Sequence, residues 1–123
     1  MHNILLYIAG ALPLLWGLAH LFPTKAVVRA FGNISRNNRH IITMEWIIEG
    51  LTLMFLGFLT IIITAVNPTT EISKTVYWSV FWMLNVLSVV SLFTGFKVNF
   101  ILFKLCPFIF TGSAVLIMIA LIL

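Results

Sequence analysis

Four apolar segments, each long enough to cross a bilayer, occupy almost the whole of this 123-residue chain. About 20 residues of helix are needed to cross the hydrocarbon core of a membrane. The segments cover residues 3–21, 41–66, 76–96 and 100–123. Backbone polar groups in lipid must be hydrogen-bonded within the protein, so each segment is expected to be a helix. The sequence therefore predicts one all-α domain, an integral membrane bundle of four transmembrane helices.

The composition agrees with a membrane protein and excludes several other classes. Hydrophobic residues make up 62% of the chain and charged residues 8%, whereas an ordinary soluble domain is about 25% charged. The mean hydropathy is +1.16. The single cysteine, Cys106, excludes an intramolecular disulfide, and no Cys/His cluster has zinc-finger spacing.

The basic residues are concentrated in two of the three connections between the apolar segments, and this predicts the topology. Six of the seven lie in or beside the first and third connections: Lys25, Arg29, Arg36, Arg39, Lys97 and Lys104. Only Lys74 lies in the second. The positive-inside rule then predicts cytoplasmic first and third loops and two outside termini, in a bacterial inner (plasma) membrane. This bias accounts for most of the net charge of +4, so the expected partner is the lipid bilayer and not nucleic acid.

Two local patterns carry further structural expectations. Residues 25–31 place basic and apolar side chains at near-helical spacing, which indicates a short amphipathic helix that Gly32 would end. Residues 33–38 are then expected to form a polar turn. The pairs Gly10/Gly17 and Gly50/Gly57 have the same seven-residue spacing, so each pair lies on one helical face where helices can approach closely.

The second apolar segment contains two of the three acidic residues of the chain, Glu45 and Glu49, one helical turn apart. Ionisable groups at membrane depth are costly, usually face a bundle interior or water, and mark functional sites. The two carboxylates share a helical face with Thr52 and Thr60, and this face is expected to point inward. We expect Glu45 to pair with Arg39, Lys97 or Lys104 at the interface. Glu49 lies deeper and is the stronger functional candidate.

Alternating helix directions bring other polar side chains to the same cytoplasmic depth. The predicted ligand-binding residues are Glu45, Glu49, His20, Trp16, Trp46, Trp82, Asn85 and Lys104. Aromatic and amide groups suit an amphiphile with its polar end near the cytoplasm. The expected function is therefore binding of a lipid-like or apolar ligand. A metal is not expected, because its ligands would have to come from His20, Glu45 and Glu49 alone.

Several alternatives stay open from the sequence. The chain has no Gly-rich phosphate loop, nucleophile elbow or zincin helix, so any catalysis rests on Glu49 as acid/base with His20 as its partner, in an isomerase or redox type of membrane enzyme. Proton-coupled transport along Glu49 and Asn85 is another. The protein can also act as a homo-oligomer or as a subunit of a larger membrane complex. The sequence does not indicate a cofactor.

The chain resembles the DoxX-like group of small four-helix membrane proteins. The similarity covers the four-span layout and the stretch from Gly17-Leu18-Ala19-His20-Leu21-Phe22-Pro23 to Glu45-Trp46-Ile47-Ile48-Glu49-Gly50. It implies the four-helix membrane fold. That group has links to quinone and thiol redox chemistry, which a chain with one cysteine cannot reproduce in dithiol form.

Overall fold

A computed structural model describes all residues from 1 to 123 and contains five helices and no strands. The helices are α1 (His2–Leu21), α2 (Thr24–Ala30), α3 (Arg36–Val66), α4 (Glu71–Gly95) and α5 (Ile101–Ile122). All except α2 are long and apolar enough to cross a membrane. The predicted fold class, an all-α integral membrane bundle of four long helices, is confirmed.

Two of the long helices extend beyond the apolar segments because their first residues are capped. The Ser35 side chain accepts a hydrogen bond from the backbone N–H of Asn38, so α3 begins within the expected polar turn. Thr70 caps α4 in the same way through the N–H of Ser73. The turn prediction for residues 36–38 is therefore wrong. The amphipathic helix is confirmed as α2, and Gly32 follows it with a φ of +74°.

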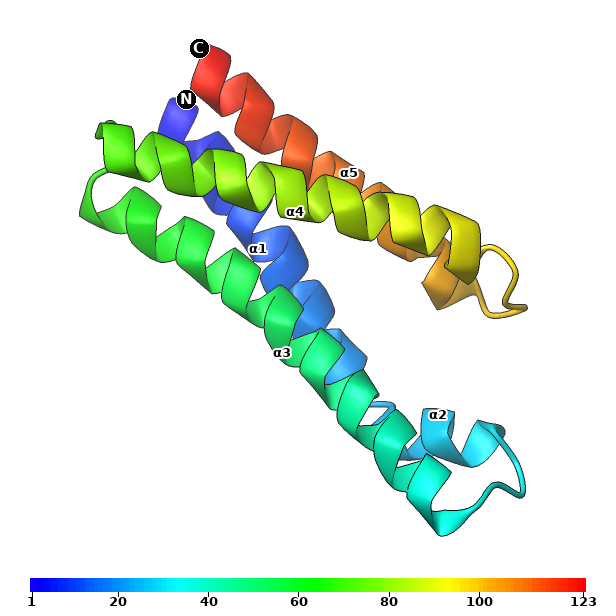
Figure 1. The fold of residues 1–123 in the computed structure, drawn as a ribbon. Helices are drawn as coiled ribbons and strands as arrows, with labels where there is room; N and C mark the ends of the chain where they lie inside the picture. The colour runs from blue at the N-terminus through cyan, green and yellow to red at the C-terminus, as the bar shows by residue number, and fades with distance from the viewer.

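The four long helices form two pairs that meet at one end and separate at the other. α1 packs along α3, α4 packs along α5, and α1 also contacts α5, whereas α3 and α4 touch over a short stretch only. Figure 1 shows the pairs together near the two termini and the α3–α4 turn, and apart near α2 and the α4–α5 loop. We call these the closed end and the open end of the bundle.

Close contact between α1 and α3 depends on the four spaced glycines. The antiparallel helices match them crosswise, Gly10 with Gly57 and Gly17 with Gly50. A Cβ on Gly17 would lie 2.5 Å from the Gly50 carbonyl oxygen, and a Cβ on Gly57 would overlap the Gly10 carbonyl oxygen. Only a residue without a side chain allows this separation. The predicted close packing is confirmed, and it joins α1 and α3 into one arm of the bundle. The α4–α5 pair forms the second arm.

A proline and a serine join this arm to α5. Pro13 lies inside α1 and has no N–H, so it cannot donate to the carbonyl oxygen of Ala9 one turn earlier. The hydroxyl of Ser113 on α5 donates to that oxygen at 2.6 Å, and Ala9 and Ser113 are both fully buried. The backbone acceptor that Pro13 leaves free is therefore used for helix–helix contact.

Buried hydroxyls also tie α3 to α4 at the closed end. Thr64 donates to the carbonyl oxygen of Thr60 at 2.7 Å, so its hydroxyl oxygen accepts from Tyr77 on α4 at 3.0 Å. In the connecting turn, Ser73 donates to the carbonyl oxygen of Asn67. No hydrogen bond joins the side chains of α3 and α4 nearer the open end. Side-chain hydrogen bonds between α3 and α4 are thus confined to the closed end.

Candidate functional site

The separation of the two arms leaves a cleft of about 420 Å³ between α3 on one side and α4 and α5 on the other. Its apolar lining includes Leu53, Leu87, Phe103 and Phe110. Its polar lining comes from both walls: Glu45, Glu49 and Thr52 on α3, and Ser91 and Thr94 on α4. The cleft is therefore amphipathic.

The predicted polar stripe of α3 is buried in one half and lines the cleft in the other. Leu56 and Thr60 are buried where α3 packs against its neighbours, whereas Glu45 and Glu49 are exposed toward the open end. The expectation of a single inward-facing stripe holds for its second half. In the first half of the stripe, α4 diverges from α3, so this face of α3 lines the cleft.

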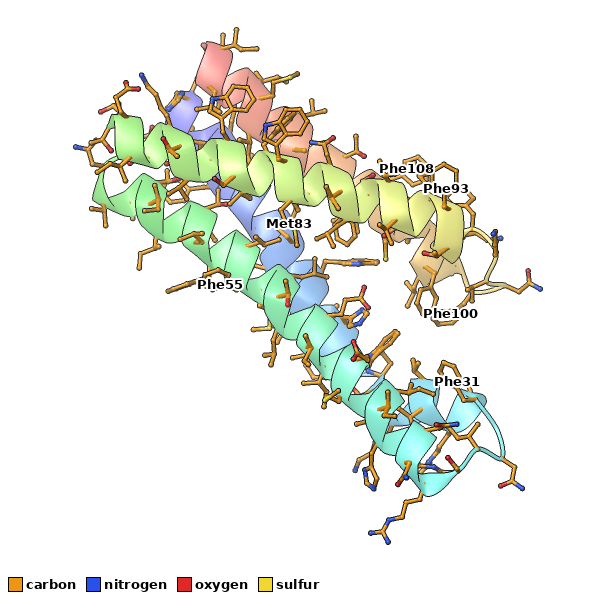
Figure 2. All side chains as sticks on the ribbon, in the orientation of Figure 1. Phe31, Phe55, Met83, Phe93, Phe100 and Phe108 are labelled. Carbon is orange, nitrogen blue, oxygen red and sulfur yellow. The ribbon has the colours of Figure 1, made fainter.

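A second, smaller cavity of about 80 Å³ adjoins the cleft and is almost entirely aromatic and apolar. Trp16, His20, Trp46, Phe100 and Phe103 supply its rings. Phe103 and Cys106 line both spaces, so the two adjoin at α5. Figure 2 shows Phe100 at the start of α5 and Phe31 beside α2 on opposite sides of the open end. We call the smaller space the aromatic pocket.

His20 is held between the aromatic pocket and the cleft by Trp46. The indole of Trp46 stacks on the imidazole with ring centroids 3.8 Å apart and an interplanar angle of 14°. Its Nε1–H also donates to the backbone carbonyl oxygen of His20 at 2.8 Å. That carbonyl belongs to the last turn of α1, where no intrahelical donor is left. Trp46 therefore caps α1 and fixes the imidazole plane at once.

The imidazole of His20 lies against the carboxylate of Glu49, as the alternating helix directions predicted. Nε2 of His20 is 3.5 Å from Oε2 of Glu49, beyond the roughly 2.7–3.2 Å of an N–H···O hydrogen bond. The His20 side chain is 7% exposed, and Nε2 has no hydrogen-bond partner within the protein. The Glu49 side chain is 49% exposed toward the cleft. A buried polar atom and a half-exposed carboxylate thus meet where the pocket joins the cleft.

Glu45 lies one turn nearer the open end and is not ion-paired. The only pair of a lysine or arginine with a carboxylate is Lys74–Glu71, which joins exposed residues at the start of α4, and the imidazole of His20 approaches Glu49 rather than Glu45. The predicted pairing of Glu45 with Arg39, Lys97 or Lys104 is therefore not formed within 4 Å. Two carboxylates line the cleft with no lysine or arginine in contact with either.

Three of the predicted ligand-binding residues lie outside both spaces. Trp82 is 64% exposed on α4, and Asn85 donates to its own helix through the carbonyl oxygen of Phe81. Lys104 is on α5 next to Phe103 but lines neither the cleft nor the aromatic pocket. The structure brings together Trp16, His20, Trp46, Glu45 and Glu49 from the predicted set.

The lining residues that the sequence analysis did not predict come mainly from α5 and from the last turns of α4. Phe103 is the most central of them, because it lines both spaces and packs edge-on against Trp46 with centroids 5.6 Å apart. Cys106 was noted for its thiol, and its sulfur accepts from Nε1 of Trp16 at 3.4 Å. The Phe103-x-x-Cys106 spacing puts both side chains on one face of α5, and this spacing could have identified them from the sequence.

No group of three or more His, Cys, Asp or Glu side chains is arranged to hold a metal ion. The chemistry of the site therefore lies in its carboxylates, its imidazole and its aromatic rings. These groups can bind a cation, accept hydrogen bonds and exchange a proton with a bound molecule.

Together, the four long apolar helices and the lateral cleft define a small integral membrane protein with an amphipathic cavity. Comparison with protein families, with curated proteins and with solved structures gives no match for this chain.

Proposed function

We propose that this protein binds a lipid-like amphiphile in the cleft between its two arms. The observation that carries the proposal is the pairing of an amphipathic cleft with a smaller aromatic pocket at its side. An acyl or other apolar body fits against Leu53, Leu87 and Phe110, and a polar end fits beside Glu45 and Glu49. Ligand sites of this kind are mostly apolar, with few polar groups that fix orientation.

We further propose that the open end faces the cytoplasm of a bacterial cell, with both termini outside. α2, the start of α3 and the α4–α5 loop lie at this end (Figure 1), and they contain most of the basic residues. Single cysteines at Asn37 and Thr69, in a Cys106→Ser background, test the orientation. A membrane-impermeant maleimide should label intact cells through position 69 and not through position 37. The reverse pattern would overturn the orientation.

The ligand proposal is tested by mass spectrometry of small molecules retained after purification in mild detergent. One amphiphile per protein is expected to remain bound to the wild-type chain. Phe103→Asp places a charge where the pocket and the cleft join, and should abolish retention. Phe93→Asp is the matched control, because Phe93 is 71% exposed, lines neither space, and lies on the outer face of the α4–α5 arm in Figure 2. Equal retention by both variants would refute binding in the cleft.

The contact between His20 and Glu49 supports a second candidate, acid–base catalysis on the bound molecule. A buried imidazole 3.5 Å from a carboxylate is the arrangement in which one group orients the other for proton transfer. Such an enzyme would return the retained molecule in two isomeric forms. Recovery of both forms from wild-type protein, and of one form from Glu49→Gln, would distinguish an enzyme from a binding protein.

A further inference from the structure

The charges around the cleft restrict the chemistry of the polar end of its ligand. Glu45 and Glu49 both line the cleft, and no lysine or arginine lies within 4 Å of either carboxylate. A ligand with a carboxylate or phosphate at this position would place a third acidic group beside two carboxylates that have no lysine or arginine partner. Like charges held close together repel each other. The polar end that fits beside these side chains is a hydrogen-bond donor or a cation.

A second observation points to the same place. The His20 side chain is more than nine-tenths buried, lines the aromatic pocket, and has an Nε2 atom with no hydrogen-bond partner within the protein. Buried polar atoms are nearly always hydrogen-bonded, and an unsatisfied one in a native structure requires an explanation. Nε2 faces Oε2 of Glu49 at 3.5 Å, so one donor group between the cleft and the pocket can reach both atoms.

The aromatic pocket supplies the third feature of a cation site. Trp46 is occupied on one face by the imidazole, whereas the ring of Trp16 is in no aromatic pair. Trp16 lines the pocket, and its indole is therefore an aromatic group there that no other ring stacks on. The face of an indole attracts an ammonium group within about 6 Å, and the attraction is strongest where water is excluded.

Resting on the proposed function, we propose that the amphiphile carries a protonated amine, which binds between Glu49, the imidazole of His20 and the ring of Trp16. The amine donates hydrogen bonds to a Glu49 oxygen and to Nε2 of His20, and its charge is balanced by Glu49. The alkyl body extends from there into the apolar part of the cleft, along Leu53 and Leu87. The shared chemistry is an ammonium group on an apolar chain, from either a free long-chain amine or an aminophospholipid.

The test compares three probes of one chain length with the purified protein in dodecyl maltoside micelles: dodecylamine, dodecanol and dodecanoate. Native mass spectrometry measures the amount of each bound. The amine is expected to bind about tenfold more tightly than the alcohol, because it adds an ion pair and a cation–π contact. The carboxylate should bind most weakly. A further arm offers phosphatidylethanolamine against phosphatidylglycerol, and preference for the first would identify a lipid as the source of the amine.

The matched variants are Glu49→Gln and Glu71→Gln. Both remove one carboxylate, but Glu71 lies at the start of α4, away from the cleft, and pairs with Lys74 at 2.8 Å. Glu49→Gln should abolish the preference for the amine over the alcohol, whereas Glu71→Gln should retain this preference. Equal binding of amine and alcohol to wild-type protein would refute the amine and leave the cleft proposal intact. No binding of any probe would refute both.

Discussion

The bond between Ser113 and the carbonyl oxygen of Ala9 allows a quantitative test of how α1 is joined to α5. Pro13 cannot donate to this oxygen, so the Ser113 hydroxyl is its side-chain donor, at 2.6 Å. Ser113→Ala removes the hydroxyl and leaves a buried acceptor without it. Interhelical hydrogen bonds in membrane proteins contribute on average about 0.6 kcal/mol and at most about 1.7 kcal/mol. We expect a loss near the upper value, because both residues are fully buried.

A double-mutant cycle with Pro13→Ala isolates this bond from the other effects of each substitution. Alanine at position 13 restores a backbone N–H, which can donate to the Ala9 oxygen within α1. In that background Ser113→Ala should cost only about 0.6 kcal/mol, so the coupling energy is expected to be about 1 kcal/mol. Ser79→Ala is the control, because the Ser79 hydroxyl is exposed and bonds only to its own helix at Thr75.

The assay is equilibrium unfolding in mixed micelles of dodecyl maltoside and sodium dodecyl sulfate, followed by far-ultraviolet circular dichroism. The free energy of unfolding is compared among wild-type protein, the two single variants and the double variant. If Ser113→Ala costs the same with proline as with alanine at position 13, the free carbonyl is not what the serine recognises. The explanation of the α1–α5 contact would then be wrong.

Two further substitutions test the α1–α3 and α3–α4 contacts in the same assay. Gly57→Ala should cost about 1–3 kcal/mol by overpacking, because its Cβ would overlap the Gly10 carbonyl oxygen. Gly112→Ala, where nothing lies within 4 Å of a Cβ, should be neutral or stabilising, and equal losses at both positions would contradict the packing argument. Tyr77→Phe should cost about 0.6 kcal/mol, because Thr64 keeps its bond to Thr60 and loses only the Tyr77 donor. An unchanged free energy of unfolding would show that the Tyr77 hydroxyl adds nothing to the closed end.

The sequence predicted the elements and the contacts that depend on helical spacing, but not the angle between the arms. Segment length and hydropathy define the four spanning helices, and the glycine spacing identified the α1–α3 contact. Alternating helix direction correctly brought His20 beside Glu49. The angle between the α1–α3 and α4–α5 pairs involves contacts between α1 and α5. These helices lie at opposite ends of the chain, so no local sequence pattern predicts their contacts.

Trp82 and Asn85 show why the lining of the site was harder to predict from sequence. In a soluble helix, hydrophobic periodicity marks the buried face, but lipid is as apolar as a bundle interior. The buried face of α4 follows Tyr77, Leu84 and Ser88, and an apolar side chain on any other face is equally well accommodated by lipid. The rotation of α4 about its axis, which turns Trp82 and Asn85 away from the cleft, is therefore not readable from the sequence of α4.

The opening of the arms also gives the molecule a different width in each half of the membrane. At the closed end the four long helices meet, whereas at the open end the two pairs diverge (Figure 1). The protein is therefore wedge-shaped and occupies more lateral area in one leaflet than in the other. The Thr64–Tyr77 bond lies at the narrow end, whereas nearer the wide end the arms touch through the Trp16–Cys106 hydrogen bond and the Trp46–Phe103 ring pair, so a wider wedge would break these two contacts first. A membrane curvature that separated the wide ends would therefore act on the Trp16–Cys106 and Trp46–Phe103 contacts, which lie beside the ligand cleft.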